Sequence, residues 1–439
     1  MPPPGATVQS LSDLLQIKYA PGLAPQFNDS HPNLNYIRQN NEDVTAEGDK
    51  CVIGIETGLN EAGGFHGESA DIAAAGSPTV RNVELTLKQQ TFRARISWKF
   101  MKKARTTAHA FARGLDLTLR STRTAMMLTS NGYTWGDGSG VICRVKAETD
   151  STGQLGIFDL DRAWDHTGGT GNDGGQPFLT IRQNQVIRLL DQKGVTGGET
   201  DRGQFKVLTV DVEVGAAAGF VRVTVTTLSG TYAAADPQID DYVYLQNTIT
   251  GYTDTDETQD NSPAMGMMGF YDDTLVDPLQ GLAVATEPFW KPPKLYATEA
   301  TIVSDMNKAR TAIMKRSPGS RIEYVISSHE CRDRWHDALI QKAEWRNVKK
   351  LDGSWEVAVL GGRPYFVDHT APDGIVFFIP GSNTMQRYNV ADFIEVVNDD
   401  NSTLHLVPNK TVFDILFTTL YEFGIRRRNN LVSLRNVNW

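Results

Sequence analysis

The chain has 439 residues, of which 40% are hydrophobic and 22% are charged. This length exceeds the usual size of one domain, and the composition excludes a chain that is disordered throughout, so we expect two or three domains with sizeable cores. The formal net charge of −9 argues against a dedicated nucleic-acid-binding protein, which normally has a strongly basic surface.

Three cysteines, Cys51, Cys143 and Cys331, lie far apart in the sequence. Their spacing fits neither a disulfide framework nor a zinc site, and it suits a reducing cytoplasm. The first residues lack the basic region and apolar core of a secretion signal, and no run approaches the roughly 18 apolar residues of a membrane span. We therefore expect no cofactor, no metal ion and no contact with a membrane.

Residues 1–49 are polar and rich in proline, with one short helix expected at 10–19. A segment of this kind cannot bury enough apolar area to fold alone. We expect an N-terminal arm that is either disordered or ordered on a neighbouring subunit.

Residues 50–105 predict a strand, an excursion rich in glycine and alanine, and a returning strand. Apolar side chains alternate with polar ones along both strands, which indicates one buried face. A long two-stranded ribbon is poorly stable alone and needs a partner surface. A basic stretch, from Lys99 to Arg105, ends the segment and is consistent with a solvated charged rim.

Residues 104–130 have an apolar stripe at helical spacing, with most charges elsewhere. About 25 residues give a rod of roughly 37 Å. Asn131 and Gly132 predict its end, because both residue types tolerate the left-handed conformation that closes a helix. A glycine-rich link, NGYTWGDGSGVI, follows.

Residues 145–265 differ in composition, since Thr, Val, Gly and Asp dominate and apolar residues alternate in FKVLTVDVEV and FVRVTVTTL. Short strands joined by glycine-rich turns predict a small all-β barrel or sandwich. The segment interrupts an otherwise mixed chain, so we interpret it as an inserted domain.

The remaining chain alternates helices and strands. We expect helices at 298–316 and 328–344, the first begun by Thr298 and packed through an inward face that includes Ile302 and Met314. A buried strand is expected at 322–326.

The strands at 365–367 and 375–379 flank Ala-Pro-Asp-Gly, which predicts a tight reversal between them. Because residues 375–379 are apolar throughout, we expect a central strand covered on its two sides by the two helices. Long alternating strands follow in residues 393–438, with Tyr421, Phe423 and Ile425 on one face and Glu422 and Arg426 opposite.

Several local patterns suggest chemistry, but each lacks an essential part. GTGNDG at 169–174 has no strand before it and no helix after it, so a loop is expected instead of a dinucleotide site. His329 and His336 are seven residues apart, too far for two zinc ligands on one helix, and are expected on a solvated face. Cys331 is expected to be a buried or neutral thiol.

Three further patterns are also incomplete. The segment Gly138-Ser139-Gly140 lacks the spacing of a nucleophile elbow, and the acids Asp254, Asp256, Glu257 and Asp260 lack the pattern of an EF-hand. In Arg426-Arg427-Arg428, alternation favours a pair of rim charges at a subunit contact at least as strongly as a nucleic-acid contact. We therefore predict no catalytic, cofactor-binding or metal-binding residue.

The order of these elements resembles the major capsid protein of tailed bacteriophages, a fold shared with encapsulin shells. The resemblance rests on the polar arm, the ribbon with its basic end, the long helix closing in NGYTWGDGSGVI, the helix-strand-helix, the segment GGRPYFVDHTAPDGIVFFIPGS and the long final strands. It implies an α+β fold with an N-terminal arm (1–49), an extended β-ribbon loop (50–105), a peripheral domain with a spine helix (106–144), an inserted β-rich domain (145–265), an axial domain (266–388) and C-terminal strands of the peripheral domain (389–439).

The resemblance also implies a function. The protein would assemble with itself into hexamers and pentamers of an icosahedral head around double-stranded DNA, without enzymatic activity. Its further partners would be a portal, a separate scaffolding protein and in some cases a decoration protein. It would reside in the virion and, during assembly, in the host cytoplasm. The acidic charge is consistent with a container that encloses DNA without gripping it.

Two alternatives remain open. One is an encapsulin-like compartment that encloses an enzyme. The other is a carbohydrate-binding protein that uses the aromatic residues of the insert, namely Trp164, Phe178, Tyr232, Tyr242 and Tyr244. A hydrolase has no supporting set of residues.

Overall fold

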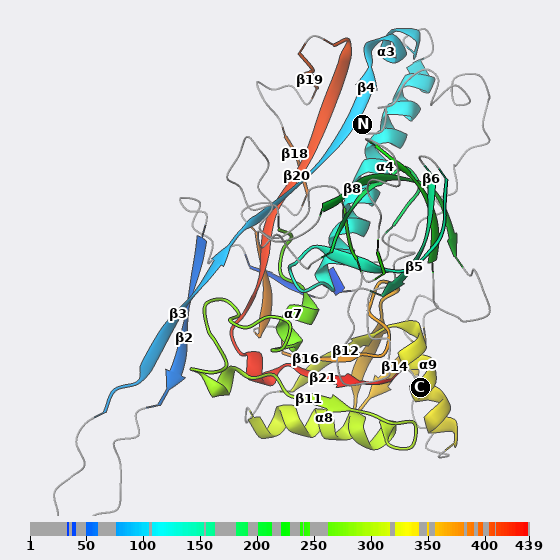
Figure 1. Ribbon diagram of the computed structural model, residues 1–439. Helices are drawn as coiled ribbons and strands as arrows, with labels where there is room; N and C mark the ends of the chain where they lie inside the picture. The colour runs from blue at the N-terminus through cyan, green and yellow to red at the C-terminus, as the bar shows by residue number, and fades with distance from the viewer. Residues whose placement is uncertain are drawn as a thin grey trace, which may run out of the picture.

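The structure, a computed structural model, describes residues 33–34, 37–40, 50–59, 76–104, 108–152, 155–162, 181–191, 201–212, 221–228, 238–239, 241–245, 262–316, 321–341, 349–350, 356–381, 384–389, 394–397, 404–408 and 410–437. These residues form two large sheets, a closed barrel and a two-stranded ribbon, with helices packed on the sheets (Figure 1). The fold is mixed α+β and rich in sheet, as expected. Among the described helices none is long and apolar enough to cross a membrane.

A seven-stranded sheet contains the strand predicted at 375–379, and every residue of that strand is buried. In order across the sheet, its strands are β11 (Lys294–Tyr296), β21 (Val432–Arg435), β16 (Val376–Pro380), β12 (Ile322–Ser327), β15 (Arg363–Val367), β14 (Glu356–Leu360) and β13 (Lys349–Lys350). The last strand of the chain, β21, thus lies in this sheet beside β16.

The expected direct pairing of β15 with β16 is wrong. β15 runs parallel to β12 and β16 runs antiparallel to it, so β12 lies between the two strands. Gly374 has the positive φ (79°) that the turn predicted. The turn is nevertheless wide enough to admit β12, whose backbone groups are hydrogen-bonded on both edges as a result. The prediction of a turn with glycine at a positive φ is therefore confirmed. The pairing of the flanking strands could not be predicted locally, because β12 comes from an earlier part of the chain.

Two helices, α8 (Ile302–Arg316) and α9 (His329–Gln341), correspond to the two predicted in this region. α8 begins later than expected, because residues 298–301 form a turn in which the Thr301 N–H donates to the Thr298 carbonyl at 3.0 Å. Met314, expected to face inward, is 42% exposed.

The two faces of β16 pack against different parts of the molecule. Val376 and Phe378 belong to an apolar cluster with residues of both α8 and α9. Phe377 and Ile379 belong to another cluster, which includes Trp135 at the end of the long helix. The expectation that α8 and α9 cover opposite faces is therefore wrong. Both lie on one face, and other segments fill the opposite one.

A second sheet of six strands joins segments from both ends of the chain. Its strands are β1 (Arg38–Asn40), β4 (Lys88–Ser97), β17 (Met385–Asn389), β18 (Glu395–Val396), β19 (His405–Leu406) and β20 (Val412–Ile425). β4 pairs with β20 along its whole length. The chain that returns from the ribbon therefore runs directly into this sheet as β4.

The long helix, α4 (Ala108–Thr134), packs on this sheet, where Met126 shares an apolar cluster with Ala94 and Ile96 of β4. It passes through Asn131, where an end was predicted. The Asn131 side-chain amide donates to Thr370 Oγ1 at 2.6 Å, so a tertiary contact satisfies a residue type that usually ends helices. The basic residues predicted on a strand begin a short helix, α3 (Trp98–Ala104), instead.

A closed barrel forms from the segment predicted to be all-β. Around the barrel the strands are β10 (Tyr242–Leu245), β5 (Val141–Thr152), β6 (Leu155–Arg162), β9 (Val221–Thr227), β8 (Asp201–Val212) and β7 (Val186–Leu190). The interior is apolar, and Phe158 and Phe205 contact each other edge to face with ring centroids 5.7 Å apart. β5 starts four residues before the predicted boundary at 145.

We expect residues 141–246, expressed alone, to unfold cooperatively, because the barrel has a closed set of strands and its own core. A segment that starts at 145 should not, since it lacks Val141, Cys143 and Arg144, which pair with β10 and close the barrel. Thermal melts followed by circular dichroism, with amide dispersion in NMR spectra, provide the measurement. Poor dispersion in the longer segment would contradict an autonomous domain.

Candidate functional site

The ribbon of β2 (Lys50–Gly58) and β3 (Thr79–Thr86) projects from the body of the molecule (Figure 1). On one face, Ile53 and Val83 are buried. On the other, Val52 and Val80 are 55% and 58% exposed. Among the described strands none pairs with the outer edge of β2 or β3, so the ribbon and its exposed β-branched side chains form a surface suited to contact with another polypeptide.

The root of the ribbon is fixed on the body by close packing. A Cβ atom added at Gly424 of β20 would meet Leu85 Cδ1 at 2.5 Å and the Tyr388 ring at 2.6 Å, so a larger residue there would force these two side chains to shift. Leu282 and Trp290 complete the apolar cluster under the ribbon, the latter from the short helix η1 (Pro288–Trp290). The ribbon is thus anchored at one end, while residues 60–75, most of the excursion predicted at 58–79, lie outside the described part of the chain.

Part of the N-terminal arm lies on its own subunit. β1 pairs in parallel with β17, and Leu34 and Ile37 are buried in the apolar cluster that also contains Trp135. The Asn33 N–H donates to Asp368 Oδ2 at 3.4 Å. For residues 33–34 and 37–40, the expectation of disorder or of a neighbouring subunit is therefore wrong. The helix expected at 10–19 falls outside the described residues.

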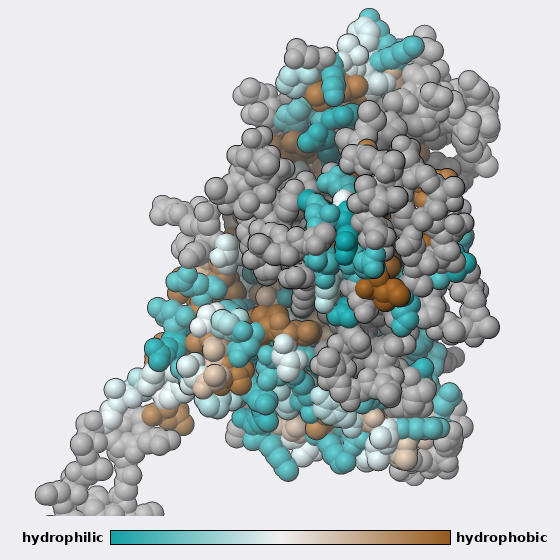
Figure 2. Space-filling model, in the orientation of Figure 1, coloured by the Kyte–Doolittle hydropathy of each residue, from teal (hydrophilic) through white to brown (hydrophobic). Residues whose placement is uncertain are grey.

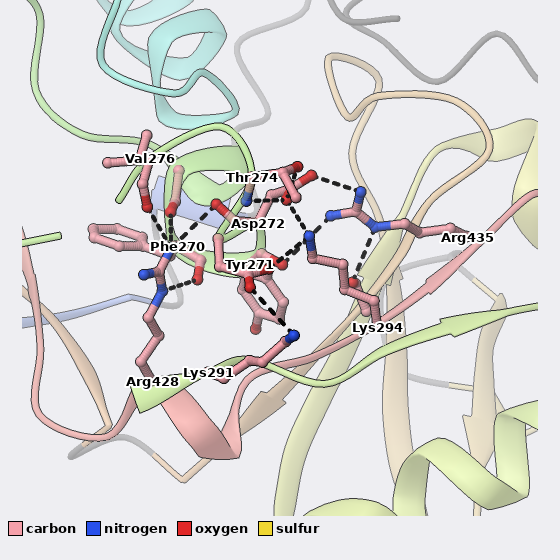
Figure 3. Close-up of polar contacts among 12 residues, drawn as sticks. Phe270, Tyr271, Asp272, Thr274, Val276, Lys291, Lys294, Arg428 and Arg435 are labelled. Atoms are coloured by element: carbon pink, nitrogen blue, oxygen red, sulfur yellow. Dashed lines mark hydrogen bonds and ion pairs between the residues drawn. The ribbon is translucent and has the colours of Figure 1, made fainter. Parts of the chain in front are cut away.

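A buried set of charges connects four elements at the edge of the seven-stranded sheet, and we call Asp272, Lys294, Arg428 and Arg435 the polar junction (Figure 3). Asp272 follows α7 (Met267–Tyr271), Lys294 belongs to β11, Arg435 to β21 and Arg428 to the short helix η2 (Arg428–Asn430). The Asp272 carboxylate accepts from Arg435 Nη1 at 2.7 Å and also from Lys294 Nζ.

The electrostatics of Asp272 follow from these partners. Burial alone would raise the pKa of its carboxyl group, but the charge of Arg435 and hydrogen bonds from Lys294, Thr274 and Arg435 outweigh burial and hold the pKa well below 3.8. Asp272 is therefore ionised, and its charge compensates two buried cations. The junction ties the end of α7 to the edge of the seven-stranded sheet.

Arg428 corrects the expectation of exposed arginines at 426–428. Its side chain is fully buried, and it donates to the carbonyl oxygens of Gly269, Phe270, Asp272 and Val276 at 3.0 to 3.1 Å. Burial lowers its pKa to about 10, so the guanidinium stays charged at neutral pH. It satisfies carbonyl groups left free where α7 ends. Strand alternation does not apply there, because β20 ends at Ile425.

The residues weighed for metal binding are separated by the fold. His329 is exposed, while His336 is half-buried with its ring 5.4 Å from that of Trp335; the latter departs from the solvated position expected. Cys331 is buried, and burial raises the pKa of its thiol to about 12, which agrees with a neutral thiol. The described residues contain no group of three or more His, Cys, Asp or Glu side chains that could hold a metal ion.

Ser139 lies in a buried turn, where its hydroxyl donates to Asp137 Oδ1 at 2.5 Å. The contact is local and follows the pattern of a turn-stabilising bond. The stretch GTGNDG at 169–174 and the acids at 254–260 lie outside the described residues.

The aromatic residues weighed for carbohydrate binding do not gather in the described part of the barrel. Tyr244 is fully buried in an apolar cluster shared with Trp135. Tyr242 is half-buried, with the Arg144 guanidinium 4.8 Å from its ring centroid. Trp164, Phe178 and Tyr232 fall outside the described residues.

The polar junction was missed by sequence reasoning. Asp272 and Lys294 lie in stretches of sequence that contain other polar residues, and no periodic pattern distinguishes them from these neighbours. The one usable signal was the position of Arg435 next to apolar residues in the last described strand, because a charged residue buried there needs a partner.

No protein-family model matches the sequence, and no curated protein matches it significantly. Among solved structures, a chain of the cyanophage A-1(L) capsid is 11% identical, with 98% of this chain and 99% of that chain covered and a TM-score of 0.52. An encapsulin from Synechococcus elongatus is 8% identical, covering 99% and 96%, with a TM-score of 0.44. A chain from Mycobacterium phage Ogopogo is 9% identical, covering 98% and 99%, with a TM-score of 0.42. The similarity to the cyanophage capsid chain shows that this chain has the fold of a phage capsid protein.

Proposed function

We propose that the protein is the major subunit of a capsid shell. The observation that carries this proposal is the likeness to the cyanophage capsid chain along nearly the whole length of both. The projecting ribbon supports it, because a strand pair anchored at one end offers contact area to a second copy without needing a core of its own.

In detail, the subunits would form hexamers and pentamers of an icosahedral head around the double-stranded DNA of a tailed phage. Rings of identical subunits use heterologous contacts that close only at a fitting rotation, and adjustable ribbons permit more than one ring size. A portal, a separate scaffolding protein and a decoration protein are the expected partners. The barrel would project from the shell. The protein would act in the virion, after assembly in the host cytoplasm, and would have no catalytic role.

Deleting residues 58–79 should leave a soluble, folded subunit that no longer builds closed particles. The deletion removes the tip of the ribbon but retains Ile53, Val83 and Leu85, which pack at its root. Negative-stain microscopy of the expressed wild-type and shortened proteins measures the effect directly.

The matched control replaces residues 192–200, between β7 and β8 of the barrel, with a Gly-Ser linker and should assemble like the wild type. Normal particles from the ribbon deletion would show that the ribbon is dispensable. Wild-type particles that contain a copurified enzyme and no DNA would instead indicate a compartment shell.

A further inference from the structure

The charges of this chain are unevenly distributed. Residues 88–123 contain ten Lys and Arg residues and one acidic residue, Asp116, which gives this stretch a formal charge of +9. Because the whole chain has a charge of −9, the remaining residues together carry −18. An acidic total therefore coexists with one strongly basic segment.

This segment forms β4, α3 and the first half of α4, at the end of the molecule where these elements meet (Figure 1). Phe100 of α3 lies in the same apolar cluster as Leu119 and Met126 of α4, so the two helices are packed together. Their outward side chains include Trp98, Lys99, Lys102, Arg120 and Arg123, all of them exposed, and we call these residues the basic face.

Two other cations of the segment are compensated within the subunit. Arg95 makes a bidentate pair with Asp414, at 2.8 and 3.0 Å, and Arg93 lies 3.6 Å from the same carboxylate. On the basic face, Lys102 has an aromatic neighbour. Lys102 Nζ lies 4.3 Å from the centroid of the Trp98 ring, a contact that orients the ammonium group without neutralising it.

Hydrophilic side chains surround the α3 end of the molecule in the space-filling view, with hydrophobic surface between them (Figure 2). Trp98, which is 44% exposed, is one large apolar side chain at this end. Clustered, exposed Lys and Arg side chains are typical of surfaces that contact nucleic-acid phosphates.

We propose that the basic face binds the phosphate backbone of double-stranded DNA. The inference rests on the proposed shell function and deepens it: the basic face would line the interior, and the enclosed DNA would contact the subunits there. The acidic remainder would repel DNA from other surfaces, so that binding is confined to one region and stays weak enough to reverse.

The test uses the full-length chain at nanomolar concentration and a fluorescent 30-base-pair duplex, titrated at several salt concentrations. In the variant K99Q/K102Q, the slope of log K against log salt should fall by about 2, since each lost phosphate contact removes about 1. Affinity at low salt should fall about tenfold or more. The control K315Q/R321Q removes the same charge from exposed positions elsewhere and should bind like the wild type.

A second measurement separates this inference from the shell function. Particles of K99Q/K102Q purified from cells should look normal by negative stain but hold less nucleic acid, judged from the ratio of absorbance at 260 and 280 nm. Equal loss of affinity in both variants, or binding of poly-glutamate but not of the duplex, would overturn the proposal, the latter in favour of an acidic protein partner. Absence of particles from the wild type would instead contradict the shell function, whatever the duplex binding shows.

Discussion

Replacing Asp272 with Asn should lower the free energy of unfolding by about 3 to 5 kcal/mol. The carboxylate lies within hydrogen-bonding distance of Arg435 and Lys294, whose side chains are 2% and 13% exposed. An amide of the same shape would leave Arg435 without the counter-charge of Asp272, and Lys294 with that of Asp273, 2.6 Å away, so the cost of desolvating the two cations would be offset less well. Urea unfolding of the wild type and the variant measures the difference.

The pH dependence of this difference has a definite sign. Because the pKa of Asp272 in the folded protein lies below its ordinary value of 3.8, its contribution to stability is present above that value and is lost as the pH falls through the folded pKa. The difference in the free energy of unfolding between the wild type and D272N should be constant above about pH 5 and should become smaller in more acidic solution.

The control is D333N on α9. Asp333 pairs with Arg332 at 2.7 Å, but its side chain is 60% exposed, so the change should be at most about 1 kcal/mol. Similar losses from D272N and D333N, or a gap that widens in acid, would show that the polar junction does not stabilise the fold through its charge.

Truncating either phenylalanine of β16 should cost about 3 to 5 kcal/mol through lost transfer energy and a cavity. Phe377 and Phe378 are both fully buried, but they face opposite sides of the sheet. The ring of Phe377 lies 5.4 Å from that of Trp135 and 5.0 Å from that of Tyr271, whereas Phe378 packs with residues of α8 and α9. F377A should therefore loosen the end of α4, and F378A the two helices.

Losses of this size are a large part of a domain's net stability, so both variants should aggregate before they assemble. Particle yield and the midpoint of urea unfolding measure these outcomes. Hydrogen exchange should show reduced protection in α4 for F377A and in α8 and α9 for F378A. H329Q, at an exposed position on α9, is the control and should retain both stability and assembly. Wild-type particle yield from either Phe variant would contradict the central place assigned to β16.

Side-chain periodicity along the chain predicted the barrel strands, the buried strand β16, the long helix and the ribbon. These features follow from local rules, because a period of two or of 3.6 residues already specifies which side chains share a face. Tyr421, Phe423 and Ile425 on β20 are buried together as the alternation indicated. Glu422 and Arg426 were expected on the opposite face of the strand. Glu422 is in fact 6% exposed and accepts the Met265 N–H at 2.7 Å.

The candidate site divides in the same way. The sequence alone determined that a ribbon leaves the body, that residues 88–123 are basic, and that the order of elements resembles a capsid protein. Only the tertiary structure decided that β12 separates β15 from β16, that α8 and α9 share one face, and that Arg428 and Arg435 are buried beside residues 269–276. All of these outcomes join segments that are not adjacent in the sequence, and the Arg428 and Arg435 contacts span more than 150 residues. No local period encodes them, because the partner that satisfies a buried strand edge or a buried charge is selected by the packing of the whole chain.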